Sequence, residues 1–372
     1  MKTNGLLTLV IGLCLTSLCN AKGLDAKLQA KAEKAVEKGY AFLKTRQAED
    51  GSWLGKQYPA ITGIVLKAFL MDDKYTARTP FIRKGLDYIV ANVQPDGGIY
   101  RKVLGNYNTN LCIMALAEAK DPKLAPVLER AVAFAKGLQW DEGENTPRSN
   151  SWYGGAGYGN RQRPDLCNLS MLLDAMHDAG VSPDDPVFKR AVVFISRCQN
   201  NSETNQFASL RLPVGNDGGF FYTCANRGES KAAPAVVTAP DGKKILHSYG
   251  SMTYAGVKGL LYANLKREDR RIQGALRWIR ENYTLDENPG MGQKALYFYY
   301  ITFARTMDVL GDETFTDARG IKHAWRTELA KKLISLQSPD GRWQNEKSRW
   351  MEATPELVTP YAIVALKIAM KK

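Results

Sequence analysis

The sequence predicts an all-α protein with the architecture of an α6/α6 toroid, in which six helical hairpins form two concentric rings of six helices. Two observations lead to this expectation. A pattern of twelve residues recurs six times along the chain, and a second, more apolar helical segment follows each copy. Self-similarity at such spacings is typical of stacked supersecondary units. A ring that closes on itself also needs no capping repeats.

Each copy of the pattern carries apolar residues at positions i, i+3, i+4 and i+7, which is the stripe of an amphipathic helix. Five of the six copies end in glutamine, and several are followed by turn residues such as Pro339-Asp340-Gly341. Because each copy has a charged face, we expect these helices to form the outer ring. The copies span residues 36–47, 83–94, 128–139, 188–199, 272–283 and 326–337.

The segments that follow the copies carry few charges on any side. A helix that is covered by its partner on one side and faces a central axis on the other should be apolar all round, so we assign these segments to the inner ring. They span approximately residues 60–71, 109–119, 165–179, 251–265, 293–310 and 355–370.

The first 21 residues have the features of a signal peptide. Lys2 precedes an uncharged apolar run from Leu6 to Cys19, and small residues at its end favour cleavage after Ala21. The run is too short to span a membrane. Neither Cys14 nor Cys19 has the small preceding residue of a lipoprotein anchor. We therefore expect a secreted or periplasmic protein whose residues 22–372 form a single domain, since no linker divides them.

The composition is basic, with a formal net charge of +13. The lysines and arginines are dispersed over the outer segments, which favours a solvated face, and we expect no nucleic-acid partner. Peripheral contact with an anionic envelope surface is the partner that this charge suits. The glycine-rich stretches lack the order strand, loop, Lys-Ser/Thr and helix of a nucleotide site, and no cofactor is expected.

Four cysteines remain after the signal peptide. Cys112 and Cys167 lie in apolar helical patterns and are interpreted as buried thiols. In an oxidising compartment the four residues allow three disulfide pairings, and the sequence does not choose among them. The four are Cys112, Cys167, Cys198 and Cys224.

Three turns carry a recognisable motif. Residues 47–53 and 337–343 both read Q-x-x-D-G-x-W, and residues 94–100 are a softer copy. These segments resemble the QW motif of the prenyltransferase and squalene-cyclase repeat family, part of the terpenoid cyclase superfamily. The resemblance implies a helical toroid in which the glutamine and tryptophan tie neighbouring repeats together, and it covers essentially the whole chain after residue 21.

The chemistry of this family does not follow from the resemblance, because its catalytic motifs are missing. Cyclases of the hopene type use a D-x-D-D-T-A-like acid element, whereas the paired acids here, in residues 71–74 and 183–186, suit turns and helix caps. Asp165-Leu166-Cys167, with His247 further along, is similar to the zinc ligands of protein prenyltransferases. We interpret Asp165 as a helix N-cap instead and expect no metal. The thioester element of complement-like toroids is also absent.

Two long insertions precede inner helices at one face of the predicted toroid, at residues 140–164 and 200–250. A loop of about 50 residues is often functional. Acids near these helix starts are candidates for proton transfer, and aromatic residues there are candidates for binding a ligand. The candidate catalytic residues are Asp165, Glu287 and Glu352. The candidate ligand-binding residues are Tyr158, Tyr222, Tyr249, Tyr254, Tyr299 and Trp350.

Three functions remain open at this point. The resemblance implies a cyclase-like enzyme or binder that takes an isoprenoid-like or other bulky apolar ligand. Export and basic charge favour a carbohydrate-active toroid, such as a polysaccharide lyase or hydrolase acting on an acidic polymer. The lack of a complete catalytic motif favours a non-catalytic envelope scaffold. We therefore expect a small hydrophobic or carbohydrate ligand and leave enzymatic activity open.

Overall fold

The computed structural model describes residues 23–55, 57–207 and 212–371, so the predicted signal peptide lies outside the described residues. Within them the chain forms twelve α-helices, four short 3-10 helices and two small antiparallel sheets. No helix in these described ranges is long and apolar enough to cross a membrane.

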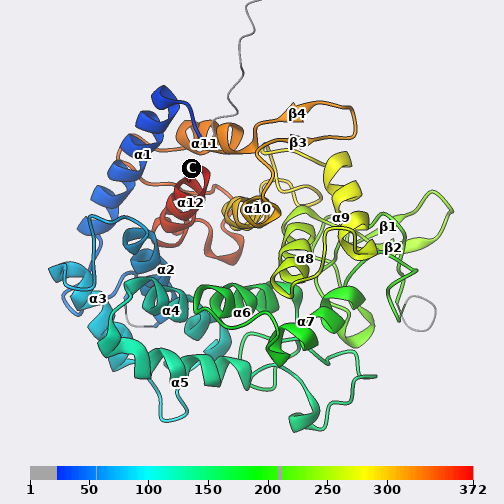
Figure 1. Cartoon of the computed structure of the whole chain (residues 1–372), viewed down its shortest axis with the longest axis horizontal. Helices are drawn as coiled ribbons and strands as arrows, with labels where there is room; N and C mark the ends of the chain where they lie inside the picture. Colours follow the sequence, from blue (N-terminus) through cyan, green and yellow to red (C-terminus); the bar gives the residue numbers. More distant parts are fainter. Residues whose placement is uncertain (1–22, 56, 208–211, 372) are drawn as a thin grey trace, which may run out of the picture.

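The odd-numbered helices lie at the periphery (Figure 1) and coincide with the six copies of the repeated pattern. Aspartates cap three of them: Asp25, Asp185 and Asp269 each accept a hydrogen bond from a backbone N–H of the first turn. These outer helices are α1 (Ala26–Thr45), α3 (Pro80–Ala91), α5 (Ala125–Lys136), α7 (Pro186–Arg197), α9 (Arg270–Glu281) and α11 (Trp325–Ser335).

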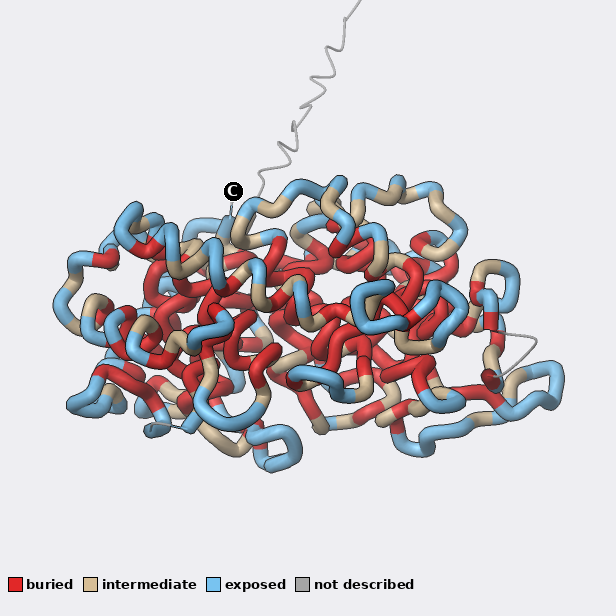
Figure 2. Tube along the Cα trace, turned by 90° about the horizontal axis from the view of Figure 1, so that it is seen from below, coloured by how far each residue is buried: buried red, intermediate tan, exposed pale blue. Residues whose placement is uncertain are grey.

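The even-numbered helices form the interior of the ring. All twelve residues of α2 are buried, as expected for a helix covered on every side. Figure 2 shows the same arrangement from the side, with buried segments inside and exposed loops around them. The inner helices are α2 (Pro59–Leu70), α4 (Gly105–Ala119), α6 (Leu166–Asp178), α8 (Gly250–Tyr262), α10 (Leu296–Leu310) and α12 (Pro355–Ala369).

The inner helices close on themselves. Each even-numbered helix packs against the next in chain order, and α12 packs against α2. The first outer helix, α1, packs against both α11 and α12, so the two ends of the described chain lie side by side. The ends of the six inner helices therefore converge on a common centre, and any site formed there combines residues from the whole sequence.

Glutamines at the ends of the outer helices join consecutive repeats. The Nε2 of Gln47 donates to the carbonyl of Phe81, at the start of α3, and Gln139 and Gln199 make equivalent bonds to Val187 and Arg271. Gln337 donates to the Ala35 carbonyl at 2.8 Å, which ties the last repeat to the first.

Tryptophans from two of the turns fill the space between the rings. Trp53 and Trp343 are fully buried, and their indole Nε1 atoms donate to the carbonyls of Leu43 and Leu333. Their backbone N–H groups donate to Thr62 and Thr359 on the following inner helices. Each tryptophan thus links the outer and inner helix of its own hairpin.

Glycine is required where these turns pass beneath a neighbouring outer helix. Gly341 has a φ of +92°, and a Cβ there would lie 2.3 Å from the carbonyl oxygen of Lys38 in α1. At Gly154 the equivalent distance, to the carbonyl oxygen of Arg190 in α7, is 2.0 Å. A larger residue would be strained in conformation and would also collide with the helix.

The β-strands lie in the long connections. β1 (Val236–Thr238) pairs with β2 (Lys244–Leu246) within the insertion before α8, and β3 (Phe315–Thr316) pairs with β4 (Lys322–His323) before α11. The four 3-10 helices are η1 (Pro122–Leu124), η2 (Glu142–Glu144), η3 (Ala225–Arg227) and η4 (Arg349–Met351).

Candidate ligand-binding site

A cavity of about 270 Å³ lies at the N-terminal ends of the inner helices. All six inner helices, or the loops that lead into them, contribute to its wall. It is lined by Tyr58, Ile61, Leu104, Tyr107, Tyr158, Cys167, Met171, Tyr222, Lys231, Tyr249, Ser251, Met252, Met291, Ala295, Phe298, Trp350, Met351, Glu352, Leu357 and Tyr361.

Most of this wall is aromatic or aliphatic. Methionines adapt to irregular apolar shapes, and aromatic rings offer large flat contact areas. Pockets for small molecules commonly combine such a lining with a few placed polar groups. Apart from tyrosine hydroxyls, the polar side chains here are those of Cys167, Ser251, Lys231 and Glu352.

Glu352 is the single carboxylate among the described lining residues, and it caps a helix. One carboxylate oxygen accepts a hydrogen bond of 2.9 Å from the backbone N–H of Phe298, in the first turn of α10, and the other accepts 2.6 Å from Asn345 Nδ2. Burial raises the pKa of Glu352 to about 7, and these hydrogen bonds oppose the shift. Burial therefore favours the protonated form of Glu352 far more than that of an ordinary glutamate.

Asp165 lies directly behind the wall. Its carboxylate accepts hydrogen bonds from the backbone and side chain of Asn168, at 2.9 and 2.7 Å, which makes it the N-cap of α6 as expected. Burial raises its pKa to about 6, against the opposing effect of hydrogen bonds from Asn168 and from the Tyr222 hydroxyl. Asp165 contacts the cavity through Tyr222.

Tyrosine hydroxyls form two hydrogen-bonded groups in the wall. Tyr107 and Tyr361 face each other with 3.0 Å between their oxygens. Tyr222 is hydrogen-bonded to both Asp165 and Tyr158. Burial raises the pKa of all four tyrosines, so they remain neutral hydrogen-bonding groups near pH 7.

Charged side chains are concentrated at the rim of the cavity. Arg163 and Lys231 both contact the carboxylate of Glu229, and the Lys231 Nζ also lies 5.0 Å from the centre of the Tyr222 ring. Across the rim, the guanidinium of Arg349 stacks at 4.4 Å on the ring of Trp350, which is 38% exposed.

The structure brings together most of the residues singled out in the sequence. Tyr158, Tyr222, Tyr249, Trp350 and Glu352 line the cavity, although more than 190 positions separate the first from the last. Convergence follows from the closed ring, since each residue lies in or near a loop that leads into an inner helix.

Three predicted residues lie elsewhere. Tyr254 and Tyr299 are buried in an aromatic cluster with Phe303, where the Tyr254 ring is 5.5 Å from Tyr299 and 5.1 Å from Phe303. Their helices present a different face to the cavity, through residues such as Met252 and Phe298. Glu287 is exposed on the turn before α10 and does not reach the cavity. The expectation that these three share the pocket is corrected.

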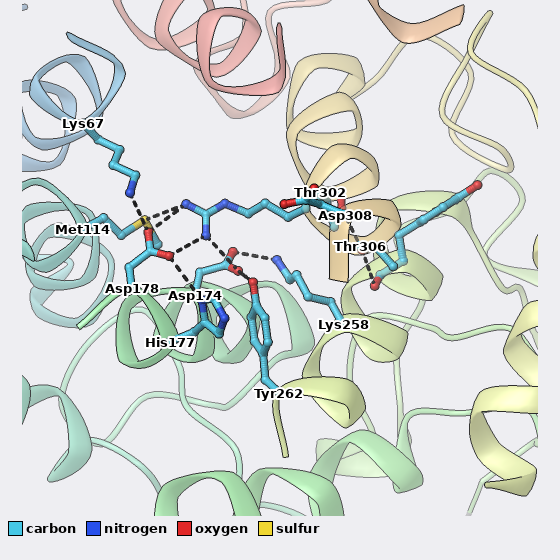
Figure 3. A network of polar contacts seen from close by, with 12 residues as sticks. Lys67, Met114, Asp174, His177, Asp178, Lys258, Tyr262, Thr302, Thr306 and Asp308 are labelled. Atoms are coloured by element: carbon cyan, nitrogen blue, oxygen red, sulfur yellow. Dashed lines mark hydrogen bonds and ion pairs between the residues drawn. The ribbon is translucent and has the colours of Figure 1, made fainter. Parts of the chain in front are cut away.

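Sequence analysis missed a buried ionic cluster below the cavity, at the C-terminal ends of the inner helices (Figure 3). Arg305 of α10 binds Asp178 at 3.0 Å and Asp174 at 3.5 Å, both on α6. Lys258 of α8 binds Asp174 at 2.6 Å. Lys67 of α2 binds Asp178 at 3.1 Å and also contacts Glu118 of α4.

This cluster closes the ring at the end opposite the mouth. Three cations and three carboxylates balance one another, so the charges are buried as a neutral set. A signal for it exists in the sequence: Lys67, Lys258 and Arg305 are isolated cations within otherwise apolar helical segments. Met171, Phe298 and Tyr361 border both the cavity and the small space beside the cluster, and therefore form the floor of the cavity.

The residues similar to zinc ligands are engaged in other contacts. The oxygens of Asp165 are taken by Asn168 and Tyr222, and His247 Nδ1 lies 2.8 Å from the carbonyl oxygen of Pro234. No group of three potential ligands occurs in the part of the chain that the structure describes. The absence of bound metal stays a prediction.

The four cysteines fall into two kinds of environment. Cys112 and Cys167 lie apart on inner helices, and burial raises the pKa of both thiols. Cys198, at the end of α7, and Cys224 are both buried, and their side chains are hydrogen-bonded to each other. All four are free thiols in this structure.

Comparison with solved structures places the architecture among helical toroids. A type II terpene cyclase from Scytonema, in complex with its product merosterolic acid A, aligns over 93% of this chain and 99% of its own, with a TM-score of 0.57 and 11% identity. An inactive variant of an α-1,6-mannanase from Salegentibacter, in complex with α-1,6-mannotriose, aligns over 92% and 99%, with a TM-score of 0.56 and 10% identity.

An α-amylase from Clostridium perfringens is similar to the same degree, with a TM-score of 0.54 and 12% identity over 91% of this chain and 98% of its own. No family model matches the sequence. At these identities the likeness concerns the fold alone. It supports the predicted mostly helical toroid, and the neighbours include both terpene cyclases and carbohydrate-active enzymes.

Proposed function

We propose that this chain is an exported α6/α6 toroid of the prenyltransferase and squalene-cyclase repeat type that binds an isoprenoid-like or similarly bulky apolar ligand in its central cavity. The observation that carries the proposal is the cavity wall, which is built of tyrosines, methionines and aliphatic side chains from all six inner helices. A variant of a type II terpene cyclase with a similar fold is in complex with its product, merosterolic acid A. The Q-x-x-D-G-x-W turns and their hydrogen bonds are consistent with this type of repeat.

The acids of the site suit binding better than cyclisation. Protonating an alkene requires a strong acid, whereas burial raises the pKa of Glu352 to about 7 and that of Asp165 to about 6. Both groups also cap helices, which fixes them in place. The proposal is therefore a binding function, without a commitment to turnover.

A carbohydrate-active function remains as a second candidate. Its supporting observation is Glu352, because a carboxyl group with a pKa near 7 suits a general acid in glycoside hydrolysis. The partly exposed ring of Trp350 could stack on a sugar. Glycosidases ordinarily use two facing carboxylates, however, and Glu352 is the single one among the described lining residues.

The test uses the isoprenoid alcohol geranylgeraniol as the apolar probe, with mannotriose and polygalacturonate as carbohydrate probes. Binding would be followed by tryptophan fluorescence, since Trp350 lies in the wall. Ile61→Phe should fill part of the cavity and weaken geranylgeraniol binding by tenfold or more. Ile321→Phe, at an exposed position on the β3–β4 turn, is the matched control and should leave binding unchanged.

Two results would reject the proposal. One is the absence of geranylgeraniol binding by the folded protein. The other is binding that Ile61→Phe leaves intact. Binding or cleavage of a carbohydrate probe that is lost in Glu352→Gln would favour the second candidate instead.

A further inference from the structure

The polarity of the cavity is divided between its two ends. The floor and the body of the wall carry Ile61, Met171, Met252, Phe298 and Leu357. Most of the fixed charges lie at the rim, in the insertions before α6 and α8 and in the loop before α12. A ligand that fits such a site has an apolar body and a polar head, with the head at the mouth.

The rim carries more positive than negative charge. Glu229 is shared by Arg163, at 2.5 Å, and by Lys231, so a single carboxylate faces two cations. Arg349 forms no ion pair within the described part of the chain and stacks on Trp350. Three cations and one carboxylate leave an excess of two positive charges around the opening.

Two rim cations, Lys231 and Arg349, lie against aromatic rings of the cavity wall. Lys231 lines the cavity and lies over the ring of Tyr222, and Arg349 lies over the ring of Trp350. A cation over an aromatic face is positioned without being neutralised, because the ring offers only a quadrupole. Arg349 is held in this way, whereas Lys231 also contacts Glu229. Each group has several N–H donors, so donors remain for a ligand.

Two carboxyl groups lie deeper in the site. Glu352 lines the cavity and Asp165 lies behind Tyr222, and both cap helices through bonds to Phe298 and Asn168. Their negative charge disfavours an anion at depth, whereas the N-terminal ends of the six inner helices carry partial positive charge toward the cavity. An anionic group is thus favoured at the mouth, beside the rim cations.

We infer that the ligand is an amphipathic anion, with its apolar chain in the cavity and its anionic head group bound by Lys231 and Arg349. This inference rests on the proposed binding function and adds the charge of the ligand to it. The chemistry that the site recognises is a long apolar body ending in a carboxylate or a comparable oxyanion.

The test compares retinoic acid with retinol, which share one polyene body and differ in the charge of the head group. The wild-type protein should bind the acid about three- to tenfold more tightly, the range expected for partly exposed ion pairs. Raising the salt concentration from 0.05 to about 0.5 M should weaken the binding of the acid and leave that of the alcohol nearly unchanged.

Substitutions of the rim cations test whether they cause the preference for retinoic acid. Lys231→Gln with Arg349→Gln should abolish the preference for the acid, so that retinoic acid and retinol bind with similar affinity. Lys231→Gln leaves Glu229 paired with Arg163, so no buried charge is stranded. Lys34→Gln, on the exposed face of α1, removes a charge far from the cavity and should change neither affinity. Lys231→Arg should retain the preference.

The outcomes separate the two ideas. If neither retinoid binds to folded protein, the proposed binding function fails. If both bind with equal affinity, or if the double variant keeps the full preference for the acid, the cavity binds apolar ligands and the inferred anionic head group is wrong.

Discussion

Glu352 illustrates how one residue can serve the fold while lining the cavity. Its carboxyl group completes the N-terminus of α10 through the N–H of Phe298 and binds Asn345, yet it lies in a wall that is otherwise mostly apolar. Hydrogen bonds stabilise the ionised form and burial destabilises it, and burial prevails. The residue therefore makes stability depend on pH.

The sign of this dependence follows from linkage. Glu352 has an ordinary pKa near 4.5, and burial raises its pKa to about 7 in the folded protein. Between these values the unfolded chain has released a proton that the folded protein retains, so the free energy of unfolding falls as pH rises through this window. The expected contribution is on the order of 3 kcal/mol.

Replacing Glu352 with Gln should remove this contribution. Urea unfolding at pH 4.5 and pH 8 should show a smaller loss of stability on raising the pH in Glu352→Gln than in wild type. Glu287→Gln, at an exposed glutamate, is the control and should retain the wild-type slope. An unchanged slope in Glu352→Gln would show that the residue is ionised throughout this range.

The cysteines permit a second prediction at this scale. The Phe221 N–H donates to the Cys198 carbonyl at 3.0 Å, which holds the segment leading to Cys224 beside the end of α7, where the two side chains meet. With oxidised glutathione as acceptor of the two electrons and two protons, we expect a Cys198–Cys224 disulfide. Peptide mapping by mass spectrometry should find this pair linked and Cys112 reduced. A bridge involving Cys112 would contradict the structure.

At the scale of the helices, the local sequence predicted well which segments are helical and which ring each helix belongs to. Apolar periodicity located all twelve, because amphipathic outer helices and fully buried inner helices differ in pattern. Periodicity was less informative about the wall of the cavity, since an inner helix is apolar on every face. For that reason the sequence could not distinguish Tyr254 and Tyr299 from the residues that line the cavity. How deeply the long connections are buried depends on tertiary contacts, which the periodicity does not report.

The turn glutamines permit a prediction about the hydrogen bonds that join one repeat to the next. The side chain of Gln337 bonds both to Gly341 in its own turn and to Ala35 in α1, whereas the Gln94 side chain, within the described residues, donates to the carbonyls of Asn92 and Tyr100 in its own turn. Gln337→Ala should lower stability by about 0.5–1.5 kcal/mol, because it removes a hydrogen bond that joins the last repeat to the first. Gln94→Ala should cost less.

Thermal and urea unfolding of the two alanine variants provide the comparison. Both remove the same side chain from the same position of the repeat, so helix propensity and lost surface area largely cancel. Equal losses of stability would mean that the bond across the junction between the last and first repeats contributes nothing.

At the scale of the whole molecule, ring closure has two consequences that no single element carries. One end of the ring gathers the N-terminal ends of the inner helices around an apolar cavity, and the other gathers side chains near their C-terminal ends into the ionic cluster. The cavity residues were largely anticipated because topology dictates which loops share a face. The pairing of Lys67, Lys258 and Arg305 was not, because it depends on side-chain geometry across five helices.

The ionic cluster should behave as one unit. Arg305 is buried and contacts both Asp174 and Asp178, so Arg305→Leu leaves these carboxylates with their lysine partners and the buried cluster with one negative charge in excess. We expect the loss to be about 3–5 kcal/mol, as for other broken buried ion pairs. Removing one negative charge as well, in Arg305→Leu with Asp178→Asn, restores neutrality and should recover part of this loss.

The control lies on the surface. Arg342 and Asp340 form an ion pair within an exposed turn, and Arg342→Leu should cost no more than about 1 kcal/mol. Urea unfolding of wild type, these three variants and Asp178→Asn alone measures these differences. If the double variant were less stable than Arg305→Leu by the full cost of the Asp178 change alone, the two residues would act independently. The cluster would then be a set of separate contacts, and charge neutrality would not explain why so many ions can lie buried across the closed end of the ring.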